Sequence, residues 1–255
     1  MSDNNFFGMQ DTFISHLVEL RDRLVKACAG VAIICAALFA WPGHTVIFDF
    51  LAQPMIASLP AGSKMIATGV ISPFLVPMKV TLMLAFLIAL PWVLYQVWAF
   101  IAPGLYAHEK RLIAPLVISS SFLFAAGVAF CYFFVFGRVF KFITEFAPTS
   151  ITVSPDIENY LDFIMSMCLA FGLTFEVPIV VIVLVRTGIL TVEKLKAIRS
   201  YVIVGAFIIA AVVTPPDVVS QLALAIPMWM LFELGLFIAP IFVKATQAPT
   251  TPPDQ

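Results

Sequence analysis

Charged residues are scarce in this sequence. Asp, Glu, Lys and Arg together make up 11% of its 255 residues, whereas soluble domains carry about 25%. Histidine occurs three times and cysteine four times, with no CxxC pair and no GxSxG or HExxH motif. The scarcity excludes a soluble domain. It gives no support for an enzyme, a cofactor, a metal site or a nucleic-acid-binding surface, and we expect none of these.

Long apolar runs take the place of charge. Hydrophobic residues make up 62% of the chain, and six segments are long enough, or nearly long enough, to cross a bilayer core of ~30 Å as helices. The segments are 24–41, 74–101, 112–136, 161–185, 201–213 and 221–240. They are too long and too evenly apolar for barrel strands. We predict an all-α polytopic membrane protein, with one six-helix transmembrane domain at 1–242 and a short cytoplasmic tail at 243–255.

Basic residues are distributed unevenly between the loops. Ten of the fourteen Lys and Arg lie in the N-terminal segment, the second and fourth loops and the tail. Because positively charged loops stay in the cytoplasm, six spans predict that both termini are cytoplasmic. The N-terminus has no basic n-region and no small-residue cleavage pattern, so we expect no cleavable signal peptide and expect the first span to direct insertion.

Before the first span, residues 13–24 have apolar side chains every three or four positions, which predicts an N-terminal amphipathic helix at the membrane interface. Glu19 and Arg23 lie on its polar face, four residues apart. The ordinary interpretation of this spacing is an ion pair that stabilises the helix by a few tenths of a kcal/mol.

Prolines predict that the bundle is curved. Each removes a backbone N–H and tends to kink a helix. Those in or near the spans are Pro91, Pro115, Pro178 and Pro227. The fifth span, at 201–213, is also short, about 20 Å at 1.5 Å per residue. The first outer loop is rich in proline and aliphatic residues, and we expect it to pack as a cap on the outer helix ends.

Glu176 lies near the middle of the fourth span, where a carboxylate costs ~2.5 kcal/mol or more. Such a residue normally faces a cavity or a partner, although a purely structural role stays open. A proton-coupled secondary transporter that uses Glu176 is the alternative function. The lack of an internal repeat argues against that alternative.

Five short motifs occur in order within residues 13–242. They are SHLVELRDRL at 15–24, MIAT and SPF at 65–68 and 72–74, YQVWAFIAPGL and HE at 95–105 and 108–109, FGLTFEVP at 171–178, and TPPD at 214–217. The set resembles the TatC family, the core integral membrane subunits of the twin-arginine protein translocase.

The resemblance implies a non-enzymatic receptor in the bacterial cytoplasmic (inner) membrane, with a glove-shaped six-helix bundle. Such a receptor binds signal peptides that carry two consecutive arginines, and folded proteins are then exported by the proton-motive force. The implied partners are the single-span subunits TatA and TatB, the signal peptides of folded cargo, and further copies in a larger complex. A scaffold that lacks peptide affinity stays open as a rival.

The motifs also imply site residues. For signal-peptide binding they are Glu19, Arg21, Phe100 and Glu109. Two guanidinium groups need carboxylates that accept paired hydrogen bonds, which the two glutamates offer. Phe100 is expected to support the site by packing, and Glu176 to serve a later step such as deep insertion of the peptide.

Two further groups of site residues are expected. Thr214 and Gln221, near the ends of the short helical hairpin, are expected to bind the single-span partners, although helix capping explains them equally well. The residues expected to form the outer cap and the turn are Pro54, Met65, Phe74 and Asp217.

Overall fold

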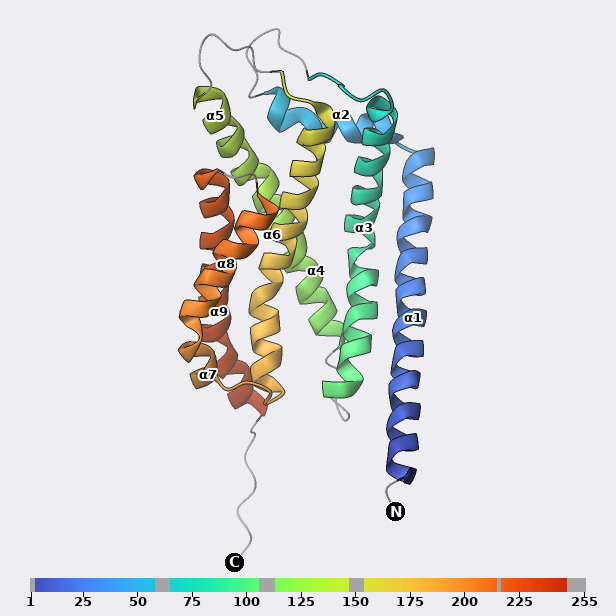
Figure 1. Ribbon diagram of the computed structural model, residues 1–255, viewed down its shortest axis with the longest axis vertical. Coiled ribbons are helices and arrows are strands. Elements are labelled where there is room, and N and C mark those ends of the chain that lie inside the picture. The colour runs from blue at the N-terminus through green and yellow to red at the C-terminus, as the bar shows by residue number, and fades with distance from the viewer. Residues whose placement is uncertain (1–2, 58–64, 106–112, 147–153, 215–216, 247–255) are drawn as a thin grey trace, which may run out of the picture. The chain divides into compact units, whose positions relative to one another are not determined.

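Helices make up nearly all of the structure, a computed structural model that describes residues 3–57, 65–105, 113–146, 154–214 and 217–246. They are α1 (Asp3–Ala40), α2 (His44–Ile56), α3 (Ser72–Leu105), α4 (Ile113–Phe130), the π-helical turn η2 (Cys131–Val135), α5 (Phe136–Phe146), α6 (Ile157–Arg186), α7 (Val192–Ala197), α8 (Arg199–Val213) and α9 (Val218–Thr246) (Figure 1).

Five stretches of the described chain are long and apolar enough to cross a membrane. They are Ile14–Ala40, Ser72–Ile101, Ile113–Phe142, Ile157–Arg186 and Val218–Ile241. The sixth apolar helix, Arg199–Val213, is shorter, as the sequence predicts. The predicted all-α polytopic fold is therefore confirmed. By packing, the chain divides into two compact units, Met1–Leu51 with Phe74–Ser121 and Ala52–Pro73 with Phe122–Gln255.

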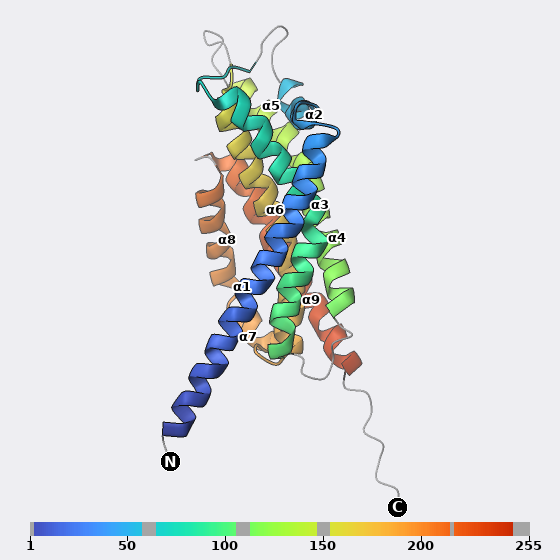
Figure 2. The ribbon, with the colours of Figure 1, turned by 90° about the vertical axis from the view of Figure 1, so that its right-hand side faces the viewer.

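In the first unit, α1 is one unbroken helix from Asp3 to Ala40 (Figure 2). This differs from the expectation of a separate amphipathic helix at 13–24. The 38 residues span about 57 Å at 1.5 Å per residue, well beyond a bilayer core of ~30 Å. The turn that carries Glu19 therefore continues the axis of the first span.

Helices α1 and α3 meet at Trp92. Its Nε1 donates a hydrogen bond to the backbone oxygen of Lys26 at 2.9 Å. A Cβ added to Gly30 would lie 2.5 Å from Cδ1 of the same indole, so only glycine fits there. Elsewhere on α3, Trp98 Nε1 donates to Ser120 Oγ at 3.0 Å in the interior. The contacts of Trp92 therefore hold α1 against α3, and the bond of Trp98 joins α3 to α4.

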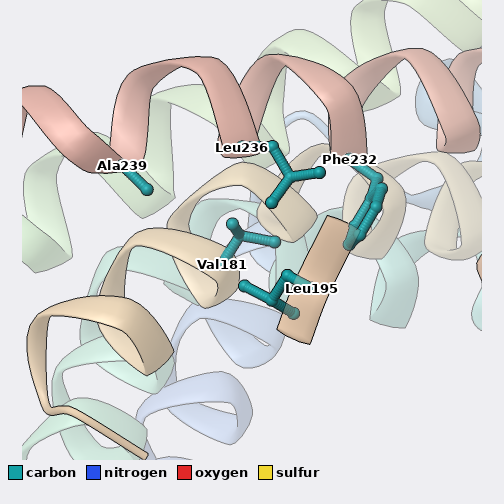
Figure 3. Packing of buried hydrophobic residues seen from close by; sticks show 5 residues of the cluster. All are labelled: Val181, Leu195, Phe232, Leu236 and Ala239. Atoms are coloured by element: carbon teal, nitrogen blue, oxygen red, sulfur yellow. The ribbon is translucent and has the colours of Figure 1, made fainter. Parts of the chain in front are cut away.

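In the second unit, α6 packs along α9, and α8 also lies against α9 (Figure 1). Their buried cluster consists of Val181, Leu195, Phe232, Leu236 and Ala239 (Figure 3). Leu195 brings the short helix α7 into this cluster. Gly235 of α9 allows close approach, because a Cβ there would lie 3.0 Å from Cα of Pro178.

The third span is irregular at a place that no proline marks. The π-helical turn η2 separates α4 from α5 within it. Just before this turn, Gly127 lies against α6, where an added Cβ would be 2.5 Å from the backbone oxygen of Phe171. Pro178 and Pro227, by contrast, lie inside α6 and α9 without ending those helices. The π-helical turn is therefore a feature that the proline positions do not predict.

Candidate functional site

One face of α1 forms the candidate site. Its residues lie three, one, three, one and three positions apart, the spacing of a single helical face. They line a shallow depression of about 390 Å³ and are Ser15, Val18, Glu19, Asp22, Arg23 and Lys26. The depression carries charges of both signs, from the carboxylates of Glu19 and Asp22 and the basic groups of Arg23 and Lys26.

Glu19 holds a guanidinium in this depression. Its Oε1 accepts hydrogen bonds from Arg23 Nε at 2.9 Å and from Arg23 Nη2 at 2.6 Å. The side chains are 37% and 24% exposed, respectively. The predicted ion pair at four-residue spacing is therefore confirmed. Beside it, Arg21 donates to Oδ1 of Asp22 from Nε at 3.1 Å and from Nη2 at 2.9 Å.

Phe100 reaches the same region from α3. Its ring stacks on the imidazole of His16, with ring centroids 4.5 Å apart and planes at 25°. His16 precedes Glu19 by three residues, so the two side chains are neighbours on α1. The motifs include both residues, but only Phe100 was expected to take part in the site. A lone histidine on a helix carries no signal of the ring that will meet it from another helix.

The arrangement suits reversible recognition of a cation. Ion pairs that are this exposed contribute only about 0–1 kcal/mol each. A guanidinium from another chain that replaces Arg23 on Glu19 would form the same bonds that it breaks. In the described part of the chain, no group of three or more His, Cys, Asp or Glu side chains is placed to hold a metal ion.

The other predicted site residues are spread over the structure. Glu109 lies outside the described residues. Glu176 is buried on α6, 8% exposed, two residues before the close approach of α9 at Pro178. Glu233, a second glutamate in an apolar helix, accepts a hydrogen bond from Arg199 Nη2 at 2.6 Å. Sequence reasoning missed this pair because 34 positions separate its members.

At the hairpin between α8 and α9, the polar groups form helix caps. Thr214 is buried, and its hydroxyl donates to the backbone oxygen of Ala210 at 2.8 Å. Oδ1 of Asp217 accepts from the backbone N–H of Ser220 at 2.7 Å, at the start of α9. Gln221 is half-buried in the first turn of α9. The capping interpretation therefore applies to Thr214 and Asp217.

The outer loop is held mainly by polar contacts. Asp156 accepts hydrogen bonds from the backbone N–H and hydroxyl of Thr68, at 2.9 and 2.6 Å, and caps α6 through the N–H groups of residues 158 and 159. Ser72 donates to Glu158 at 2.6 Å. Ile66 pairs with Asp156 in a parallel β-bridge. Sequence reasoning missed this cluster, although an aspartate directly before an apolar run is a helix N-cap signal.

The apolar residues expected to hold this loop differ in burial. Met65 is half-buried, whereas Phe74 is 64% exposed. The side chain of Pro54 lies outside the described part. Phe74 is therefore not packed in the interior. Its exposed ring suits contact with lipid or with another chain.

The comparisons with known proteins agree with the motifs. The profile of the family described as "Sec-independent protein translocase protein (TatC)" matches residues 15–227. The chain belongs to the TatC family. A Sec-independent protein translocase protein TatC of Haemophilus influenzae is 51% identical to it over 226 residues, which are 89% of this chain and 88% of that protein. One from Halothiobacillus neapolitanus is 50% identical over 92% of this chain, which spans 64% of that relative's length.

A solved structure extends the likeness to the fold. The crystal structure described as the twin arginine translocase receptor TatC superimposes with a TM-score of 0.78 and 37% sequence identity, covering 89% of this chain and 98% of that one. This TatC-family chain is a multi-pass membrane protein of a Sec-independent protein translocase family. The comparisons give no support to the alternative of a proton-coupled secondary transporter.

Proposed function

We propose that this TatC-family chain is the signal-peptide receptor and core subunit of a translocase in the bacterial inner membrane. It binds peptides with two consecutive arginines, and folded cargo is exported by the proton-motive force. The observation that carries the proposal is the carboxylate of Glu19, which holds a guanidinium on an open face of α1. In the ion pair, Arg23 donates two hydrogen bonds to Glu19, and an incoming arginine makes the same kind of contact.

The neighbouring residues have distinct roles in this proposal. Glu109, in the second loop, supplies another carboxylate for the arginine pair. Phe100 keeps α3 against the polar turn of α1 through its stack on His16. Arg21 lies beside the site and holds Asp22. Together these residues recognise the planar fork of N–H donors that each arginine offers, whereas twin lysine offers the same charge without that geometry.

Peptide affinity tests the proposal. The comparison uses wild type, Glu19→Gln, Glu109→Gln and the double variant, each with a twin-arginine peptide and a twin-lysine control. Charge-assisted hydrogen bonds contribute about 1.5–3 kcal/mol, and exposure to water favours the low end. Each single variant is therefore expected to bind about tenfold more weakly. Wild-type affinity in both single variants would show that the carboxylates only stabilise their helices.

Partner binding is the second part of the proposal. The single-span subunits TatA and TatB pack along α8 and α9, near Thr214 and Gln221. The half-buried amide of Gln221 is available to a polar group of a partner helix, and such bonds contribute roughly 0.6–2 kcal/mol in a membrane. Cysteines introduced at 213 and 221 should crosslink to cysteines in TatA or TatB. Crosslinks that form only to the third span would place the partners elsewhere.

A further inference from the structure

Asp22 is a second carboxylate on the face of α1 that carries Glu19. The two residues are three positions apart and line the same depression. Side chains at this spacing have Cβ atoms about 5–6 Å apart. The Asp22 side chain is 52% exposed, so another chain can reach it.

Each of the two carboxylates already holds an arginine of this chain. Arg23 directs two N–H groups at Oε1 of Glu19, and Arg21 directs two at Oδ1 of Asp22. The arginine on Asp22 is the looser one, since Arg21 is 71% exposed whereas Arg23 is 24% exposed. The face of α1 therefore displays two carboxylates about one helical turn apart, each of which holds an arginine of the same helix.

A ligand with two consecutive arginines needs two separate acceptors. Successive side chains of an extended peptide point to opposite sides, so both guanidinium groups do not reach one carboxylate in the same orientation. Arginine has a long, flexible apolar stem, and its two guanidinium groups can converge on carboxylates 5–6 Å apart. Glu19 and Asp22 provide that spacing within a single rigid helix.

We propose that Asp22 determines specificity together with Glu19: each accepts one arginine of the signal peptide, and the peptide displaces Arg21 and Arg23, which occupy the carboxylates in its absence. This inference rests on the proposed function, in which Glu109 adds a further acceptor. Exchange of one guanidinium for another conserves the number of charge-assisted bonds, so the internal arginines hold the site ready without blocking it.

Four signal peptides test the inference on the full-length chain in detergent: Arg-Arg, Lys-Arg, Arg-Lys and Lys-Lys. Asp22→Asn should weaken Arg-Arg binding about three- to fivefold, the range for an exposed pair. It should also remove most of the loss of affinity that lysine causes at one of the two arginine positions of the peptide. Glu19→Gln should do the same for the other position. Asp49→Asn, the same change at an exposed aspartate on α2, should bind all four peptides like wild type.

Two more variants separate binding from folding. Asp22→Glu keeps the charge and should restore most of the Arg-Arg affinity that Asp22→Asn loses. Arg23→Gln frees Glu19 and should tighten Arg-Arg binding about twofold, since a helical pair of this kind is weak. Asp22→Asn with wild-type affinity and unchanged lysine penalties would overturn the inference. Wild type that binds Arg-Arg and Lys-Lys equally would overturn the proposed function itself.

Discussion

Acidic residues in this chain pair with arginines either of the same helix or of another helix. Glu19 takes its arginine from the next turn of the same helix, at 2.6 Å. Glu233 takes Arg199 from the start of another helix, also at 2.6 Å. The first pair follows from a spacing of four residues and was predicted. The second depends on how α8 meets α9, which no local pattern specifies.

Glu176 is the residue whose burial is hardest to explain by local structure. It is 8% exposed in the middle of α6, where a carboxylate is costly. We expect Glu176→Gln and Glu176→Ala to leave twin-arginine peptide affinity within about twofold of wild type, because Glu176 lies far along the chain from the α1 site. Export of a folded reporter should fall in both variants.

The control for Glu176 is Glu193→Gln, an exposed glutamate on α7 that should export normally. The readouts are peptide affinity and the rate of reporter export at equal protein levels. Full export by both Glu176 variants would mean that the residue has only a packing role.

The lowered pKa of Asp156 predicts that the outer loop loosens in acid. The Thr68 hydroxyl, the N–H of Asn159 and the N–H of Thr68 lower the pKa of this carboxyl from its ordinary 3.8 to about 2. A carboxyl whose pKa is lower in the folded state stabilises that state above its unfolded pKa. This stabilisation is lost as pH falls from about 4 to about 2. Accessibility of a cysteine introduced at the half-buried Met65, in the same loop, should therefore rise over that range.

Asp156→Asn should show the raised accessibility at position 65 already at pH 7, because the amide keeps one acceptor oxygen but not the charge. Asp162→Asn, a neighbouring exposed aspartate in α6, is the matched control. Equal labelling of wild type and Asp156→Asn at every pH would show that the loop is held by its backbone bonds to residues 155 and 157 alone.

At the scale of helices, glycine decides how closely pairs approach. Gly30 admits Trp92 between α1 and α3, Gly127 and Gly172 bring α4 against α6, and Gly235 brings α9 against α6. Small residues at helix contacts are the usual means of association in membranes, where apolar side chains gain little by leaving lipid. The apolar runs predicted that the helices exist. They did not predict which glycine would face which helix.

Gly30→Ala should separate α1 from α3. The new Cβ would lie 2.5 Å from Cδ1 and 2.8 Å from Nε1 of Trp92, so the ring or the helix must move. Overpacking of this kind typically costs about 1–3 kcal/mol. Since the same junction positions Phe100 against His16, peptide affinity should fall together with thermal stability in detergent.

Gly137→Ala is the matched control for Gly30→Ala. A Cβ at that position meets nothing within 4 Å, so the change keeps the gain in helix propensity without a clash. Its stability should equal or exceed that of wild type. If Gly30→Ala behaves like Gly137→Ala, the indole of Trp92 adapts easily and does not fix the position of α1.

For the whole molecule, the distribution of basic residues predicts the orientation in the membrane. Ten of fourteen Lys and Arg lie on the side assigned to the cytoplasm. In a cysteine-free background, a single cysteine at position 194 should react only with reagent added from the cytoplasm, and one at position 70 only from outside. Both side chains are exposed, so access is not limited by packing. Labelling at position 194 only from outside would show that the chain has the opposite orientation.

The sequence alone determined the fold class, the helical segments and the family, because each depends on composition, run length or short contiguous motifs. It also determined the pair of Glu19 and Arg23, which needs only helical spacing. Tertiary structure decided the rest: the stack of Phe100 on His16, the pair of Arg199 with Glu233, and the hydrogen bonds of Asp156 to Thr68 in the outer loop. These contacts join residues far apart in the chain, and their partners are chosen by how helices pack rather than by any local pattern of residues.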